Sequence, residues 1–82
     1  MQVIAEDYAH LNVLLAGCGS IGRRHATVLG ELNVRRLTAC DPDEAKWPEF
    51  LQAAPSARMA RDFDEALRSD RFDAVFIRSI VT

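Results

Sequence analysis

NVLLAGCGSIGRRHATVLGEL, residues 12–32, is the stretch that decides the fold of this chain. It begins as an apolar run rich in Val and Leu, which is typical of a strand buried on both faces of a parallel sheet. Three glycines, Gly17, Gly19 and Gly22, break the run, and a helical pattern follows. A strand that turns through glycines into a helix presents free backbone N–H groups and the positive end of the helix dipole. The stretch therefore predicts an anion-binding turn.

The rest of the chain continues the alternation of strand and helix. The first strand is expected at residues 11–16 and the first helix at residues 21–32. Further strands are predicted over 35–40, 57–60 and 73–80, a loose turn over 43–47, and helices over 48–54 and 62–69. Pro48 suits the first turn of a helix, and Asp62 with Glu65 makes a capping-box pattern. The order β-α-β-α-β-α-β predicts an α/β fold: a half-Rossmann parallel sheet, strand order 3-2-1-4, with helices on both faces.

The first helix carries an apolar stripe at helical spacing. Its members are Ile21, His25, Val28, Leu29 and Leu32. Such a stripe predicts the face through which the helix packs. Because His25 lies on this stripe, we expect a packed histidine that is hydrogen-bonded to backbone rather than a catalytic group.

Composition narrows the class of protein. Among the 82 residues, 49% are apolar and 27% charged, as in ordinary globular domains, and the net charge of −2 does not favour nucleic acid as a partner. No apolar run approaches the roughly 18 residues that span a bilayer, so no membrane partner is expected. Cys18 and Cys40 form no CxxC pair, which favours buried, reduced thiols in a cytoplasmic protein. No group of Cys, His and acidic residues has the spacing of metal ligands.

The spacing of the glycines matches a dinucleotide-binding turn, and each position has a physical role there. Gly17 allows the tight turn, Gly19 lets backbone approach a pyrophosphate, and Gly22 lets the helix pack near the strand. The N–H groups of Ser20, Ile21 and Gly22 are expected to face the anion. Two roles are open for the hydroxyl of Ser20: it contacts a phosphate, or it caps the helix.

Asp41, at the end of the second strand, supplies the acid that such a turn requires. Its carboxylate is expected to accept hydrogen bonds from the ribose hydroxyls and to repel a 2′-phosphate, so NAD is favoured over NADP. The alternative is that Asp41 only opens the turn 41–43. Arg23 and Arg24 oppose the helix dipole unless an anion is bound, and Arg23 is the better candidate for contact with phosphate.

Four blocks of the sequence, taken together, resemble one family. GCGSIGRRHATVL, ACDPDEA, RDFDEAL and RFDAVFI are similar to successive blocks of the Gfo/Idh/MocA oxidoreductases, the group of glucose-fructose oxidoreductase and inositol dehydrogenase. The resemblance covers residues 12–77. It implies an N-terminal Rossmann domain that binds NAD or NADP. Residues matched to the pyrophosphate turn are Gly17, Gly19, Ser20, Ile21, Gly22 and Arg23, and Asp41 matches the ribose ligand.

The sequence departs from the family pattern after the fourth block. The family usually has a small residue, Thr-Pro and then a His there, whereas this chain has Arg78, Ser79 and Ile80. The family's Glu-Lys-Pro motif has no counterpart, because Lys46 stands in AKWP. No catalytic residue is therefore assigned. The expected organisation is an N-terminal arm over residues 1–10 and a partial dinucleotide-binding domain over residues 11–82, with the catalytic and substrate domain absent.

The function expected from this resemblance is the NAD(P)-binding domain of an oxidoreductase acting on a sugar, cyclitol or related hydroxyl or carbonyl substrate, inactive alone. Two alternatives stay open: a non-enzymatic dinucleotide-binding or assembly module, and a truncated remnant without function. An unfinished sheet also exposes an edge that invites self-association or a partner chain.

Overall fold

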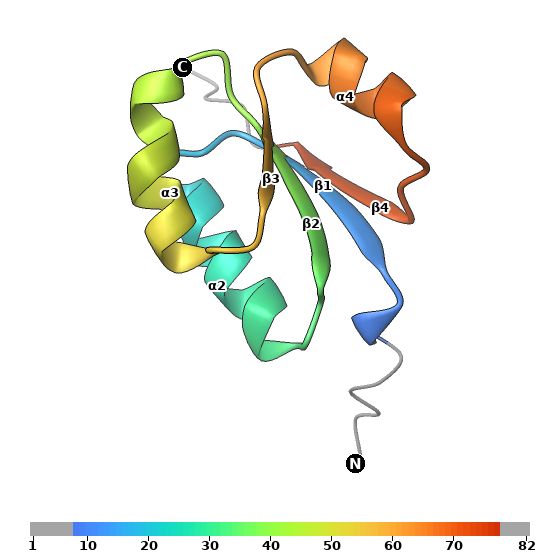
Figure 1. Cartoon of the computed structure of the whole chain (residues 1–82). Coiled ribbons are helices and arrows are strands. Elements are labelled where there is room, and N and C mark those ends of the chain that lie inside the picture. The colour runs from blue at the N-terminus through green and yellow to red at the C-terminus, as the bar shows by residue number, and fades with distance from the viewer. Residues whose placement is uncertain (1–7, 78–82) are drawn as a thin grey trace.

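Four parallel strands form one sheet at the centre of the protein (Figure 1). The computed structural model describes residues 8–77. The strands are β1 (Asn12–Ala16), β2 (Arg36–Cys40), β3 (Arg58–Ala60) and β4 (Ala74–Ile77). They lie in the order β3-β2-β1-β4, and all three pairings are parallel. The predicted α/β fold and its strand order are confirmed.

Helices cover both faces of this sheet, as predicted (Figure 1). Helices α2 (Ser20–Glu31) and α3 (Trp47–Ala53) lie on one face, and α4 (Phe63–Ser69) lies on the other. The change of face follows from topology. The connection from β3 to β4 runs back across the sheet, and right-handed crossovers in opposite directions place their helices on opposite faces.

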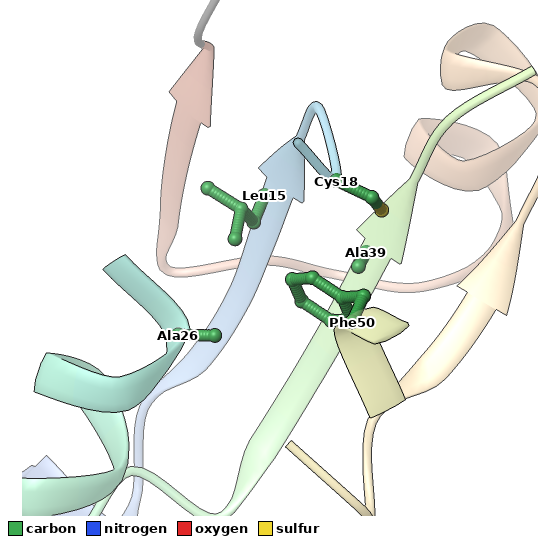
Figure 2. Close-up of a cluster of buried hydrophobic side chains, with 5 residues drawn as sticks. All are labelled: Leu15, Cys18, Ala26, Ala39 and Phe50. Carbon is green, nitrogen blue, oxygen red and sulfur yellow. The ribbon is translucent and has the colours of Figure 1, made fainter. Parts of the chain in front are cut away.

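The larger core cluster lies between the sheet and the two helices α2 and α3 (Figure 2). Its buried members are Leu15, Cys18, Ala26, Ala39 and Phe50. On the opposite face, Leu14 and Cys40 pack with Ala66 of α4. Side chains of β1 thus point alternately into two separate cores, which explains why its sequence is apolar at successive positions.

The packed face of α2 differs from the predicted one. Its buried residues are Gly22 and Ala26, whereas Ile21 is 50% exposed and Val28 is 47% exposed. Small side chains at positions 22 and 26 let the helix axis approach the sheet closely, and the large apolar residues are turned aside. His25 stacks on Phe76 of β4, with ring centroids 6.2 Å apart. Within residues 8–77 the structure shows this ring contact and not the backbone hydrogen bond that we expected for His25.

The remaining elements lie close to their predicted positions. The loose turn is a 3-10 turn, η1 (Glu44–Lys46), and Pro48 occupies the first turn of α3. Asp62 caps α4, with its Oδ1 accepting from the Asp64 amide at 3.2 Å. The predicted arm falls mostly on residues 1–7, and the departures from the family pattern at 78–80 likewise lie outside the described residues. No helix within residues 8–77 has the length and apolar character needed to cross a membrane.

A polar cluster fastens the amino-terminal edge of the sheet. Asn12 is buried, and its side-chain amide donates to Asp70 at 3.0 Å and to the Arg71 carbonyl at 2.8 Å. Its backbone amide donates to the Asp73 carboxylate at 2.8 Å. Hydrogen bonds from the Arg71 amide and from Asn12 hold the pKa of Asp70 below its usual value. The cluster joins the start of β1 to the loop that leads into β4.

Candidate functional site

The glycine turn connects β1 to α2 at the carboxyl-terminal edge of the sheet. Gly17 has φ of 107°, a conformation that favours glycine, and its amide donates to the Cys40 carbonyl at 2.8 Å. A Cβ at Gly22 would overlap the Gly17 carbonyl oxygen. Two of the three glycines are therefore required by the fold of the turn, Gly17 by its backbone conformation and Gly22 by its packing against the turn.

Gly19 differs from the other two glycines of the turn. Its φ is −74°, which any residue adopts, and a Cβ added there would meet nothing within 4 Å. The fold of residues 8–77 thus gives no steric reason for glycine at this position. A reason outside the chain, such as a ligand that approaches the backbone closely, would account for it.

The first turn of α2 keeps its backbone donors available. Gly19 is the N-cap and supplies no side-chain hydrogen bond, and no acidic residue stands in the first turn. The first intrahelical bond runs from the Arg23 amide to the Gly19 carbonyl. Within the part of the chain described, the amides of Ser20, Ile21 and Gly22 have no acceptor. The reading of Ser20 as the helix cap is wrong, because Ser20 is exposed and already lies inside the helix.

Arg23 is directed toward α3. Its Nη1 lies 3.1 Å from Glu49 Oε1, and the two side chains are 31% and 67% exposed. This pair joins α2 to α3 and accounts for one of the two cations in the first turn. Contact between Arg23 and a phosphate stays a prediction.

The carboxylate of Asp41 joins the glycine turn to the turn after β2. The residue is only 7% exposed. Its Oδ2 accepts from the Cys18 amide at 2.9 Å, and its Oδ1 accepts from the Asp43 amide at 2.9 Å. The second bond closes the turn after β2, so the turn role considered for Asp41 is present in the structure. Each carboxylate oxygen can accept a further hydrogen bond, so the same group keeps capacity for ribose hydroxyls.

A pocket of about 480 Å³ opens beside this carboxylate. Its size lies within the usual range of small-molecule sites. It lies at the carboxyl ends of the strands and is lined by Ala16, Gly17, Cys40, Asp41, Pro42, Arg61, Asp62, Phe63 and Ile77. The indole N–H of Trp47 donates to the Asp41 carbonyl at 3.1 Å, which places the single tryptophan of the chain beside the site. The structure therefore brings Gly17 and Asp41 together at one pocket.

Sequence reasoning missed the residues that follow β3, chiefly Arg61 and Phe63. In a sheet of order 3-2-1-4, the loop after β3 lies beside the loop after β2. The predicted strand order was therefore a sufficient signal to place the dipeptide Arg61-Asp62 next to Asp41. Arg61 also brings a cation to the pocket that the sequence around Asp41 does not provide.

The two cysteines serve the core rather than chemistry. Burial, with a smaller contribution from the Asp41 carboxylate, raises the pKa of Cys18 from 9.0 to about 12. Burial also raises the pKa of Cys40. Since the thiolate is the reactive form, both groups are poor nucleophiles at neutral pH.

No protein-family model matches the chain, and no curated protein matches it significantly.

Proposed function

We propose that this chain binds NAD and forms the cofactor-binding part of an oxidoreductase. The observation that carries the proposal is the open space at Gly19. Within residues 8–77 nothing requires glycine there, yet the position is the N-cap of a helix whose first N–H groups are available. It follows Gly17, which lines the pocket that contains the buried Asp41 carboxylate, by two residues.

In this proposal the pyrophosphate is held by the turn and the adenosine by the pocket. The amides of Ser20, Ile21 and Gly22 donate to the anion, and the dipole of α2 favours its charge. The carboxylate of Asp41 accepts from the ribose hydroxyls while staying fixed by the Cys18 and Asp43 amides. A 2′-phosphate beside this carboxylate would meet like charge, so NAD is favoured over NADP.

The bound nicotinamide would supply hydride transfer at a hydroxyl or carbonyl carbon. The substrate class that we propose, a sugar, a cyclitol or a related compound, rests on the resemblance of four sequence blocks to the Gfo/Idh/MocA oxidoreductases. That motif evidence bears on the cofactor more strongly than on the reaction. No catalytic residue is proposed, and the chain alone is expected not to turn over substrate.

A second candidate function is a dinucleotide-binding or assembly module without chemistry. It is favoured by the apolar side chains that β4 leaves exposed: Val75, Phe76 and Ile77. Such a module would use the same cofactor site and would present β4 to another chain.

The first test is a titration with NADH, followed by energy transfer from Trp47. The variant Gly19→Ala places a methyl group where the pyrophosphate is proposed to approach and is expected to weaken binding at least tenfold. The matched control is Gly30→Ala, whose Cβ also meets nothing within 4 Å and lies in the same helix. The control should bind NADH like the original chain.

Loss of NADH binding in Gly19→Ala could come from the added methyl group at the site or from unfolding of the variant. A measurement of its stability separates these two explanations. Alanine caps helices less well than glycine, at a cost of up to about 1 kcal/mol, so the variant should remain folded. A folded Gly19→Ala that binds NADH normally would contradict the proposed pyrophosphate position. Failure of the folded original chain to bind NADH would overturn the proposed function.

A further inference from the structure

The pocket beside Asp41 contains charges of both signs. Among the residues that line it, Asp41 and Asp62 are acidic, and Arg61 is the single cation. A guanidinium is well suited to a phosphate because it can donate two parallel hydrogen bonds. Arg61 is thus the one side chain of this lining that could attract the 2′-phosphate of NADP.

Arg61 is engaged by a carboxylate from the neighbouring loop. Its Nε lies 2.9 Å from Glu44 Oε2, and the side chains are 70% and 52% exposed. Glu44 belongs to η1, directly after the Asp41 turn, whereas Arg61 follows β3. The ion pair therefore joins the loops after β2 and β3, at the edge of the pocket that Arg61 lines.

The Glu44–Arg61 pair makes the charge of Arg61 less available to an anion in the pocket. Glu44 offsets the positive charge of Arg61 and holds its guanidinium on the side of η1. Arg61 still has its terminal nitrogens as donors, but any phosphate must compete with a carboxylate already in contact. Because exposed ion pairs are weak, loss of the Glu44 charge should release Arg61 at little structural cost.

We propose that the Glu44–Arg61 pair sets the preference of this site between NAD and NADP. Asp41 disfavours a 2′-phosphate directly, and Glu44 disfavours it by holding the one cation that could compensate. The inference rests on the proposed dinucleotide site and adds two specificity-determining residues to it.

The test compares NADH and NADPH titrations of the original chain, Glu44→Gln, Arg61→Gln and the double variant. In Glu44→Gln the affinity for NADPH relative to NADH should rise about three- to fivefold, as expected for release of one exposed charge. The gain should vanish in the double variant, and Arg61→Gln alone should leave the ratio unchanged. Raising the salt concentration should also reduce the gain.

The matched control is Glu49→Gln, which removes the carboxylate from the Arg23–Glu49 pair. Neither residue of that pair lines the pocket. It should leave the NADPH-to-NADH ratio at its original value. An unchanged ratio in Glu44→Gln, or a gain that persists without Arg61, would overturn this inference while NADH binding still supports the proposed function. Absence of NADH binding to the folded original chain would overturn both.

Discussion

Single glycines of the same turn have different physical reasons for being there. Gly17 is needed for its positive φ, and Gly22 for the contact between helix and turn. Among the described residues, 8–77, neither backbone conformation nor packing requires Gly19. A motif that looks uniform in sequence thus separates into two positions that serve the fold and one that we propose to serve ligand binding.

Replacement of Gly22 by alanine should destabilise the protein. The added Cβ would overlap the Gly17 carbonyl oxygen, so the turn or the helix must shift. Overpacking of this kind costs about 1–3 kcal/mol. The midpoint of urea unfolding should therefore fall. In Gly30→Ala the midpoint should stay level or rise, because alanine in a helix stabilises the fold by about 0.5–1 kcal/mol relative to glycine. Equal midpoints for the two variants would contradict the packing argument.

The stability of the fold should decrease in alkali because of Cys18. Its pKa is about 12 in the folded chain, against 9.0 as the usual value. Above pH 9.0 the unfolded chain loses the thiol proton while the folded chain keeps it, so the free energy of unfolding falls as pH rises toward 12. Urea unfolding between pH 8 and pH 11 measures this effect. The free energy of unfolding should fall less with pH in Cys18→Ala than in the original chain. An identical fall in the two proteins would show that other groups cause it.

At the scale of elements, the sequence predicts where helices and strands occur better than which faces they bury. The strand β1 and the helix α2 follow from an apolar run and three glycines, which are strong local signals. The packed face of α2 does not follow, because Gly22 and Ala26 carry little hydrophobic signal although they make the closest approach to the sheet. The contact between Arg61 and the Asp41 pocket depends on strand order, so only the topology could have predicted it.

Helix α4 depends on its cap more than a longer helix would. It is short, and Asp62 satisfies the Asp64 amide at its start. The variant Asp62→Ala should lower the free energy of unfolding by about 1 kcal/mol. Asp62 bonds the Asp64 amide rather than that of Glu65. Among the described residues the Glu65 side chain accepts no bond from the Asp62 amide, so we expect the reciprocal half of the capping box to contribute little. Chemical denaturation of Asp62→Ala and Glu65→Ala checks this, because alanine at position 65 removes the side-chain acceptor of the capping box, and only the first variant should lower the midpoint.

At the scale of the whole molecule, the coverage of the sheet is uneven. The central strands β1 and β2 are buried between helices, whereas β4 lies at an edge and exposes its apolar side chains (Figure 1). On the face of α2, the exposed Ile21 and Val28 are further apolar residues, and His25 packs on Phe76 of β4. An apolar edge strand of this kind favours pairing with another chain.

We therefore expect the protein to self-associate as its concentration rises. Val75→Lys places a charge on the edge strand, where it opposes pairing. The matched control is Leu67→Lys on α4, since Leu67 and Val75 are both 39% exposed. Sedimentation velocity should show a mass above that of the monomer in the original chain and in the control, and a smaller mass in Val75→Lys. If Val75→Lys and Leu67→Lys self-associate equally, the contact between chains does not involve β4.

The open space at Gly19 has a consequence for the history of this sequence. The fold requires glycine at positions 17 and 22, so these positions should resist substitution in any descendant that still folds. Position 19 carries no such requirement from the part of the chain that the structure describes. In a lineage that has lost its ligand, it should drift to alanine or serine while its neighbours stay fixed. Glycine retained at position 19 across diverged descendants would support the proposed nucleotide site.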